Sequence, residues 1–229
     1  MKIVRIFFVV SFVMICTVSC VIRSYGQREQ AVESDSTVVV QDIPEGWEPM
    51  MDGKTLDGWD IVRFGGEGEP YVRNGVLVLP VAVYGLMTGV CWEVPSLPVN
   101  NYAIYYEARR TEGNDFFGSI SFPYKDSYAS LIVGGWAGAL CGLSCIDGLD
   151  ASENETTTHI NFKDHQWYPV YLRVTTDSIR AVIDTVQVVN ISTVGRKIHL
   201  RGGTIAPSLT LYTYLTTGEI RNLRIKKLP

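Results

Sequence analysis

Alternation of apolar and polar side chains is the feature of this sequence that most limits its fold. From Asp42 onward, period-two segments recur roughly every dozen residues, with Gly, Pro, Asn or Asp between them. No stretch of this part of the chain has apolar residues at helical spacing. Because side chains alternate between the two faces of a β-strand, the pattern predicts an all-β domain.

The predicted strands are numerous and short. They cover residues 75–79, 101–110, 116–122, 127–133, 167–175, 179–183, 186–191, 208–215 and 219–228, with Asp184 and Thr185 as a predicted hairpin tip. About ten strands are too many for one flat open sheet of a domain this size, whereas two packed sheets accommodate them. We therefore expect an antiparallel β-sandwich of the jelly-roll type.

The N-terminus has the layout of an export signal. Lys2 and Arg5 precede an uncharged run that ends at Cys20. The residues Thr-Val-Ser-Cys at 17–20 resemble a bacterial lipobox, although Thr17 stands where Leu is usual. We predict a lipoprotein-type signal peptide at residues 1–19, lipid attachment at Cys20, a polar tether at 20–41, and a domain at 42–229 in the bacterial cell envelope.

Two other readings of the N-terminus stay open. Cleavage after Gly26, with Ser24 nearby, would give a soluble periplasmic or secreted protein. An uncleaved anchor is the third reading, because the apolar run extended to Ile22 reaches about 17 residues, the lower limit for a membrane span.

Charge and cysteine content narrow the classes of partner. The net charge is −4, and it becomes −6 when Lys2 and Arg5 leave with the signal peptide. With no Lys/Arg cluster on a predicted face, the chain is a poor candidate for nucleic-acid binding.

Cys91, Cys141 and Cys145 remain in the domain and allow at most one disulfide. A lone C-x3-C lacks the pattern of a zinc site.

One segment departs from the strand pattern, namely Gly134 to His159. It is rich in Gly and small residues, and long loops in compact domains are often functional. The segment contains an aromatic side chain and several titratable groups, namely Trp136, Asp147, Asp150, Glu153, Glu155 and His159. The alternative is that the segment is an ordinary solvated loop.

Two further constellations carry polar chemistry. Asp115 lies in the sequence GNDFFG, whose glycines allow close approach of a ligand or another strand. Tyr105, Glu107 and Arg109 share one strand face, which suits either a surface ion pair or a sugar-binding groove. Asn114 and Asp115 could equally be plain turn formers.

These residues resemble a known family. WEPMMDGKTLDGW at 47–59 is similar to the opening hallmark of the 3-keto-disaccharide hydrolase domain, and EIRNLRIKKL at 219–228 is similar to its closing strand. The paired strands at 166–188 also match. Met51 replaces the hallmark aromatic residue, and Thr185 replaces the hairpin glycine.

The resemblance implies a concanavalin-like jelly roll that acts on carbohydrate. Better-known members cleave 3-keto-glycosides. A ketone at C3 acidifies the C2 proton, so a carboxylate or His can remove it before the C1 substituent leaves by β-elimination and water adds back. An electrophile must stabilise the enolate oxygen.

Placed on this sequence, the chemistry gives candidate residues for each role. The candidate base is Asp115 or Glu155, and His159 is the other proton-transfer group. Arg109 is the candidate partner of the enolate. The candidate substrate-binding residues are Trp136 and Tyr128, as stacking surfaces, with Tyr105, Glu107 and Glu153.

A non-catalytic sugar-binding lipoprotein is the main alternative, because the same fold supports both functions. A retaining glycosidase is disfavoured, since the E-x-D-x-x-E signature is not evident. We expect no organic cofactor and assign no metal ligand, although the reaction allows a divalent cation. The expected partner is carbohydrate or an oxidised glycoside, with membrane contact only through the lipid.

Overall fold

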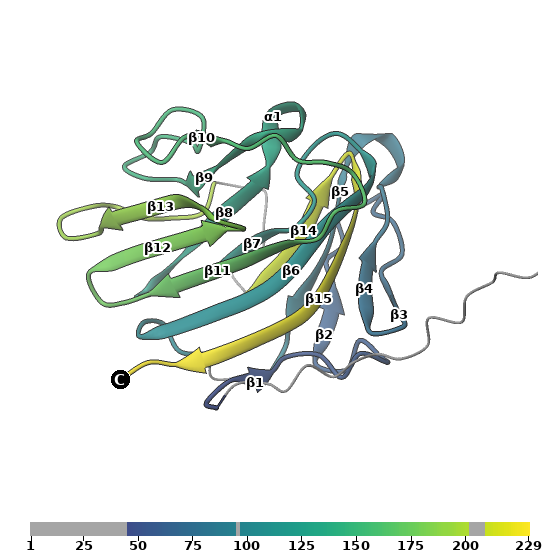
Figure 1. Ribbon diagram of the computed structural model, residues 1–229, viewed down its shortest axis with the longest axis horizontal. Helices are drawn as coiled ribbons and strands as arrows, with labels where there is room; N and C mark the ends of the chain where they lie inside the picture. The colour runs from purple at the N-terminus through teal and green to yellow at the C-terminus, as the bar shows by residue number, and fades with distance from the viewer. Residues whose placement is uncertain (1–44, 95–96, 202–208) are drawn as a thin grey trace, which may run out of the picture. The chain divides into compact units, whose positions relative to one another are not determined.

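The described part of the chain is a sandwich of two antiparallel sheets. The computed structural model describes residues 45–94, 97–201 and 209–229, drawn in colour in Figure 1. The chain separates into residues 1–37 and 38–229, and all described residues belong to the second unit. The predictions for the signal peptide, Cys20 and the tether lie outside the described residues. The predicted all-β, two-sheet jelly roll is confirmed.

Sheet A holds the longest strands. Its order is β13-β12-β11-β6-β15-β4-β3, and β1 also pairs with β15. The bounds are β1 Glu48–Pro49, β3 Tyr71–Arg73, β4 Val76–Leu79, β6 Tyr102–Gly113, β11 Tyr168–Val174, β12 Ser178–Ile183, β13 Val186–Ser192 and β15 Thr216–Lys227. The long, bent β6 and β15 run side by side through the middle of Figure 1.

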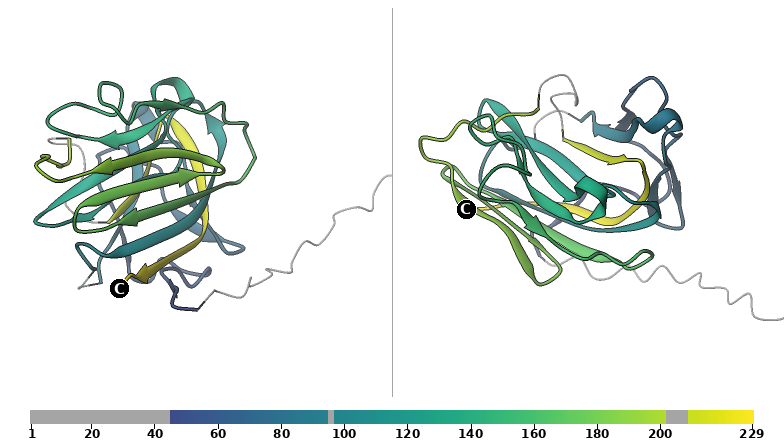
Figure 2. Two further views of the ribbon diagram at one scale, coloured as in Figure 1. Left: turned by 60° about the vertical axis from the view of Figure 1, so that its left-hand side comes forward. Right: turned by 90° about the horizontal axis from the view of Figure 1, so that it is seen from above.

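Sheet B packs behind sheet A, and the two layers can be followed in the turned views of Figure 2. Its order is β10-β9-β8-β7-β14-β5-β2. The bounds are β2 Trp59–Ile61, β5 Met87–Trp92, β7 Ser119–Tyr124, β8 Ser127–Gly134, β9 Leu140–Ser144, β10 Thr158–His159 and β14 Thr210–Tyr214. Two short turns complete the description, η1 (Val83–Gly85) and α1 (Gly135–Gly138).

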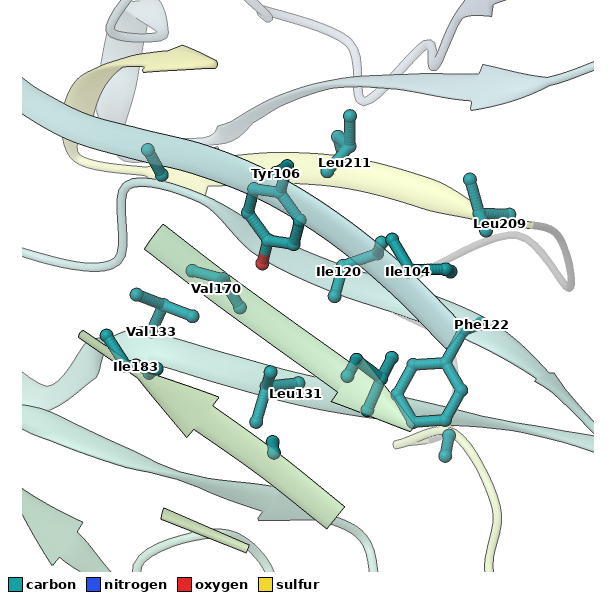
Figure 3. Packing of buried hydrophobic residues seen from close by; sticks show 14 of the residues in the cluster. Ile104, Tyr106, Ile120, Phe122, Leu131, Val133, Val170, Ile183, Leu209 and Leu211 are labelled. Carbon is teal, nitrogen blue, oxygen red and sulfur yellow. The ribbon is translucent and has the colours of Figure 1, made fainter. Parts of the chain in front are cut away.

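The core lies between the sheets and follows the predicted alternation. On β6, Ile104 and Tyr106 are fully buried and point toward Ile120, Leu131 and Leu211 of sheet B (Figure 3). The intervening residues of β6 face outward. The buried Tyr106 hydroxyl donates a 2.6 Å hydrogen bond to the Gly118 carbonyl, so its burial leaves no unsatisfied donor.

A β-bulge in β15 decides which of its side chains face outward. Arg221 pairs with Glu107, and Arg224 pairs with Tyr105, although the two arginines are three residues apart. The register shift between them inserts one extra residue, and Asn222 takes a left-handed φ of 56°. Both arginines therefore lie on the outer face of sheet A.

The prediction that 134–159 is one irregular loop is wrong in part. This segment contains α1, β9 and β10. All five residues of β9 are buried, because β9 is covered on both faces. Its residues Leu-Cys-Gly-Leu-Ser do not alternate between apolar and polar side chains, so the sequence pattern does not reveal this strand.

Three smaller predictions can be compared with the structure. The β12–β13 hairpin turns at Asp184 and Thr185, as predicted, with Asp184 at a φ of 55°. The described cysteines Cys91, Cys141 and Cys145 are free thiols. Burial raises the pKa of the Cys141 thiol to about 12. Within the described ranges, no helix is long and apolar enough to cross a membrane.

Candidate functional site

A cavity of about 390 Å³ lies beside the outer face of sheet B. Its walls come from the β6–β7 connection, α1, the β9–β10 connection, the end of β14 and Arg201. The lining residues are Asp115, Phe116, Trp136, Asp150, Ser152, Glu153, Arg201 and Tyr214. Carboxylates, a guanidinium and exposed rings in one concave site are typical of a pocket for a polar ligand with apolar faces, such as a sugar. We call it the sheet B pocket.

Asp115 is held in the pocket wall by backbone groups. Its carboxylate accepts hydrogen bonds from the backbone N–H of Phe116 at 2.9 Å and of Ala137 at 3.2 Å. Its own N–H donates to Thr216 Oγ1 at 2.8 Å. Among the described residues, no cation lies within ion-pair distance of this carboxylate. Asp115 is thus a fixed carboxylate without a neutralising partner there.

Trp136 is displayed at the rim by an unusual turn. Within the short turn α1, Trp136 and Ala137 have left-handed φ values of 48° and 68°. Non-glycine residues in this region carry strain, which is often found at functional sites. Gly138, at φ 99°, cannot take a side chain without strain, because a Cβ would lie 2.8 Å from the backbone oxygen of Asn114. The turn leaves the Trp136 side chain 45% exposed.

Asp150 and Arg201 form an ion pair on another wall. Arg201 Nη1 donates to Asp150 Oδ2 at 2.7 Å. Asp150 Oδ1 accepts from Ser144 Oγ at 2.5 Å and from the Ala151 N–H at 2.8 Å. This carboxylate is therefore neutralised and fully engaged, in contrast to Asp115.

Asn154 fixes the loop that carries Asp150 and Glu153. Its side-chain amide donates to the carbonyls of Leu143 at 2.8 Å and Asp150 at 2.8 Å, and more weakly to that of Leu149 at 3.2 Å. Its Oδ1 accepts from the N–H and the hydroxyl of Thr156. Because Asn154 is 7% exposed, this buried network holds the loop against β9.

The outer face of sheet B near the pocket carries hydroxyl groups. Cross-strand register aligns Thr210, Ser121, Ser130 and Ser144 in one row across β14, β7, β8 and β9. The Ser130 and Tyr212 hydroxyls are buried, and neither has a hydrogen-bond partner of good geometry among the described residues. Burial raises the pKa of Tyr212, so its hydroxyl stays protonated.

Aromatic rings close this face. The Phe116 ring stacks on Tyr214 with centroids 5.5 Å apart and meets Tyr212 edge-on at 5.4 Å. Phe116 belongs to GNDFFG, and Tyr212 and Tyr214 alternate within the predicted strand 208–215. That alternation is the signal in the sequence that could have indicated a shared ring face, although none of these rings is among the predicted site residues. Arg201 had no sequence signal, because its role depends on contact with Asp150, 51 residues away in the sequence.

The structure brings together only some of the predicted site residues. Asp115, Trp136 and Glu153 line the sheet B pocket. Glu155 does not line it, because Arg196 Nη1 binds this carboxylate at 2.5 Å and lowers its pKa. His159 is exposed on the edge strand β10, opposite Leu140. Tyr128 lies on β8 opposite Pro123 and is not a lining residue.

Tyr105, Glu107 and Arg109 lie on the other layer of the sandwich. They face outward from β6 in sheet A, so Arg109 does not share the sheet B pocket with Asp115. The prediction that Arg109 shares a site with Asp115 and the residues of the 134–159 segment is therefore wrong. Alternation placed it correctly on its strand face, but the sequence could not tell which sheet borders the pocket.

These outward residues of sheet A bind one another. Arg109 binds Glu219 with its Nε at 2.6 Å, and Arg221 binds Glu107 at 2.8 Å. The Trp167 ring lies between the two guanidinium groups, at 4.4 Å from Arg109 and 4.2 Å from Arg221. This network satisfies its own charges, as a surface ion pair does.

The described residues offer no preformed metal centre. No group of three or more His, Cys, Asp or Glu side chains in residues 45–94, 97–201 and 209–229 is arranged to hold a metal ion. In the sheet B pocket, the Asp115 carboxylate is bound by backbone N–H groups and the Asp150 carboxylate by Arg201.

The sequence match to a family decides the identity of the domain. The model of the 3-keto-α-glucoside-1,2-lyase-like domain matches residues 46–226. The chain belongs to this family. The resemblance found in the sequence motifs is thereby confirmed, and it covers nearly all of the described residues. No curated protein sequence matches the chain.

Solved structures support the fold of this lyase-like domain. A candidate glycosyl hydrolase from Parabacteroides distasonis is 14% identical, with a TM-score of 0.52, and the match covers 81% of this chain and 95% of the other. The Crh5 transglycosylase, solved in complex with NAG, is 13% identical with a TM-score of 0.57, covering 80% and 85%. At these identities the likeness concerns the fold alone. The family to which the chain belongs indicates a carbohydrate-active protein.

Proposed function

We propose that the lyase-like domain cleaves 3-keto-glycosides in the sheet B pocket by C2 proton abstraction and elimination at C1. The family supports this class of substrate. The observation that carries the proposal is the contrast among the three carboxylates of one cavity. Asp115 is fixed by two backbone N–H groups with no cation beside it in the described residues, Asp150 is bound by Arg201, and the exposed Glu153 accepts only a 3.4 Å bond from the Asp150 N–H.

Asp115 acts as the base. A carboxylate that accepts N–H groups and has no cation beside it retains lone pairs for a substrate proton. The base takes the C2 proton, and the C2–H electron pair forms a C2–C3 double bond while the C3 oxygen becomes an enolate. Glu155, the other candidate from the sequence, is engaged by Arg196 outside the pocket.

Arg201 replaces Arg109 as the partner of the enolate. Its guanidinium lines the pocket, and its positive charge is oriented by Asp150. The enolate then reforms the C3 ketone, a C1–C2 double bond forms, and the C1–O bond breaks with its electron pair on the leaving oxygen. Water supplies the proton to that oxygen. Water can reach the leaving group because the pocket is open to solvent at its rim, where Glu153 is exposed.

Rings hold the sugar faces in this proposal. Trp136 at the rim and Phe116 with Tyr214 on the wall give apolar surfaces for the C–H faces of a pyranose.

A sugar-binding protein without catalysis is the second candidate. Its support is that the strand positions beside the pocket carry hydroxyls, whereas the carboxylates that line it come from connections. A binder needs rings and hydrogen bonds but no base. The two candidates differ in one outcome, namely whether a 3-keto-glycoside is consumed.

Turnover of matched substrates tests the proposal. The purified chain is incubated with a 3-keto-α-glucoside and with its unoxidised parent, and the released aglycone is measured. We expect cleavage of the oxidised compound only. Asp115→Asn should lower kcat by about 100-fold or more, with KM within a few-fold. Asp184→Asn is the matched control, because Asn tolerates its left-handed turn.

Equal turnover by the Asp115→Asn and Asp184→Asn variants would refute the role of Asp115. Binding of either sugar without any turnover would favour the sugar-binding protein.

We also propose that the chain is exported and lipid-anchored through Cys20, as its N-terminal sequence predicts. Labelling of cells with radioactive palmitate should mark the wild-type protein and not the Cys20→Ala variant. An unlabelled wild-type protein would contradict lipid attachment, and residues 1–26 would then be either a cleaved signal of a soluble exported protein or an uncleaved anchor.

A further inference from the structure

The outer face of sheet A gathers cations that are far apart in the sequence. The expectation that no Lys/Arg cluster exists is wrong for this face. Single arginines on separate strands come together through cross-strand register, which a search along the sequence does not detect. On the outward positions of β3, β6, β11, β12 and β15 the cations are Arg73, Arg109, Arg173, Arg180, Arg221, Arg224 and Lys226, and the carboxylates are Glu107 and Glu219.

The cations divide into two groups along the strands. Arg73, Arg109 and Arg221 lie within ion-pair distance of Glu219 or Glu107. Arg173, Arg180 and Arg224 have no carboxylate within that distance in the described part of the chain. The second group therefore carries a net positive charge, although the whole chain is acidic.

The second group occupies one end of the face. Arg173 on β11 lies directly opposite Arg180 on β12. The same row continues through Ala103 of β6 to Lys226 of β15. Like charges directly opposite in a sheet are destabilising, so this pairing costs stability unless an anion lies over it. Asp177, at the nearby hairpin tip, is engaged by the Thr175 hydroxyl and makes no ion pair with either arginine.

Aromatic rings form the adjacent row. Tyr171 pairs with Tyr105, and Tyr105 pairs with Arg224, whose guanidinium lies 4.3 Å from the Tyr105 ring centroid. The Trp47 ring meets both tyrosines edge-on at 6.4 Å. We call this end of the face, with Arg173, Arg180, Arg224, Lys226 and these three rings, the arginine patch. Its cations and amphipathic rings are suited to the headgroup region of a membrane.

The chain enters the domain at this same end. Lys226 Nζ donates to the carbonyl of Glu45, and β1 pairs with the last residues of β15. These elements meet at the bottom of Figure 1. A lipid at Cys20 would be joined to Glu45 by the intervening residues 21–44, which span at most about 80 Å when fully extended. The arginine patch is thus the surface next to the point where the chain leads to the proposed anchor.

We propose that the arginine patch docks the domain on a membrane surface with anionic lipid headgroups. The sheet B pocket lies beside the opposite outer face, so docking leaves it open to substrate. Attraction to headgroup phosphates by several cations and burial of ring edges in the interface act together. The proposal depends neither on the reaction in the pocket nor on acylation of Cys20.

Vesicle binding tests the proposal without the lipid. The full chain with Cys20→Ala is mixed with vesicles of phosphatidylcholine alone, or of phosphatidylcholine and phosphatidylglycerol at about 7:3, and the bound fraction is measured by sedimentation. We expect binding to the anionic vesicles only, with a loss of about tenfold or more between about 0.05 M and 0.5 M salt.

Paired charge variants locate the surface. Arg173→Ser with Arg180→Ser should weaken binding to the anionic vesicles about tenfold or more and leave the thermal midpoint unchanged or higher. Arg173→Lys with Arg180→Lys should retain most of the binding. Lys54→Ser with Lys125→Asn removes the same charge from exposed positions outside the patch and should bind like the parent.

Three results would overturn the proposal: equal binding to neutral vesicles, binding that is insensitive to salt, or full binding by the Arg173→Ser, Arg180→Ser variant. Binding to polygalacturonate without binding to anionic vesicles would also overturn it, and would identify an acidic polysaccharide as the occupant.

Discussion

Arg201 donates a 2.7 Å hydrogen bond to Asp150 on the wall of the sheet B pocket. This ion pair distinguishes the carboxylates of the cavity, because it neutralises Asp150 while Asp115 has backbone partners alone in the described residues. It also orients a positive charge at the cavity. The assignment of base and enolate partner follows from this difference in environment.

We expect Glu155→Gln and His159→Gln to leave turnover of a 3-keto-glycoside within about twofold of wild type, because neither residue lines the sheet B pocket. Steady-state kinetics on both single variants checks this. A 100-fold loss in either variant would return that residue to the catalytic group and would mean that the pocket is wrongly located.

We expect Trp136→Ala to weaken sugar binding by about tenfold or more, because its exposed ring offers a stacking surface at the pocket rim. The variant should unfold at the same temperature as wild type, since the ring is 45% exposed. Calorimetric titration and thermal unfolding measure the two effects. Trp136→Phe is the control and should retain most of the affinity; an unchanged affinity in Trp136→Ala would contradict stacking at this position.

We expect Asn154→Ala to lower the free energy of unfolding by about 2 to 4 kcal/mol, because it leaves buried carbonyls and Thr156 without partners. It should also weaken sugar binding, since the same side chain holds the loop with Asp150 and Glu153. Urea unfolding measures the stability. Asn161→Ala, at an exposed position, is the control and should change stability by less than about 0.5 kcal/mol; equal stability of the two variants would show that the Asn154 network contributes little.

Glu67 gives a prediction for pH dependence. The backbone N–H groups of Glu67 itself and of Gly66, with smaller contributions from Arg63 and the Gly65 N–H, lower the pKa of its carboxyl to about 2. The folded pKa lies below the unfolded value, so the stabilisation is complete above about pH 4.5 and is lost as the pH falls toward 2.

We therefore expect wild type to be more stable than Glu67→Gln at pH 6, and the difference to shrink steadily between about pH 4.5 and 2. Urea unfolding at several pH values checks this. A difference that stays constant over that range, or grows as the pH falls, would contradict the assigned environment of Glu67.

The fold was predictable where one face of a strand is buried and the other is not. β6, β11 and β12 alternate visibly, and the structure has them near the predicted bounds. β9 was missed because its residues do not alternate between apolar and polar, and the two- and three-residue strands β1, β2 and β3 are too short for a period to register. Those strands depend on pairing with distant partners rather than on local pattern.

The site was predictable only in part, because its members come from separate connections. Asp115 and Trp136 were singled out by glycine-rich surroundings, and both line the pocket. Arg201 carries no local signal, since its role arises from contact with Asp150, 51 residues away in the sequence. Tyr214 carries only the weak signal of its alternation with Tyr212. The arginines of sheet A were missed for the same reason: their clustering exists only across strands.

The central claim is that the sheet B pocket removes the C2 proton of a 3-keto-glycoside. Turnover of a substrate deuterated at C2 measures this step directly. We expect the deuterium to slow kcat/KM by about threefold or more in wild type, to be found in solvent after reaction, and to be retained on unreacted substrate with Asp115→Asn. Cleavage at full rate with the deuterium still at C2 of the product would contradict the claim.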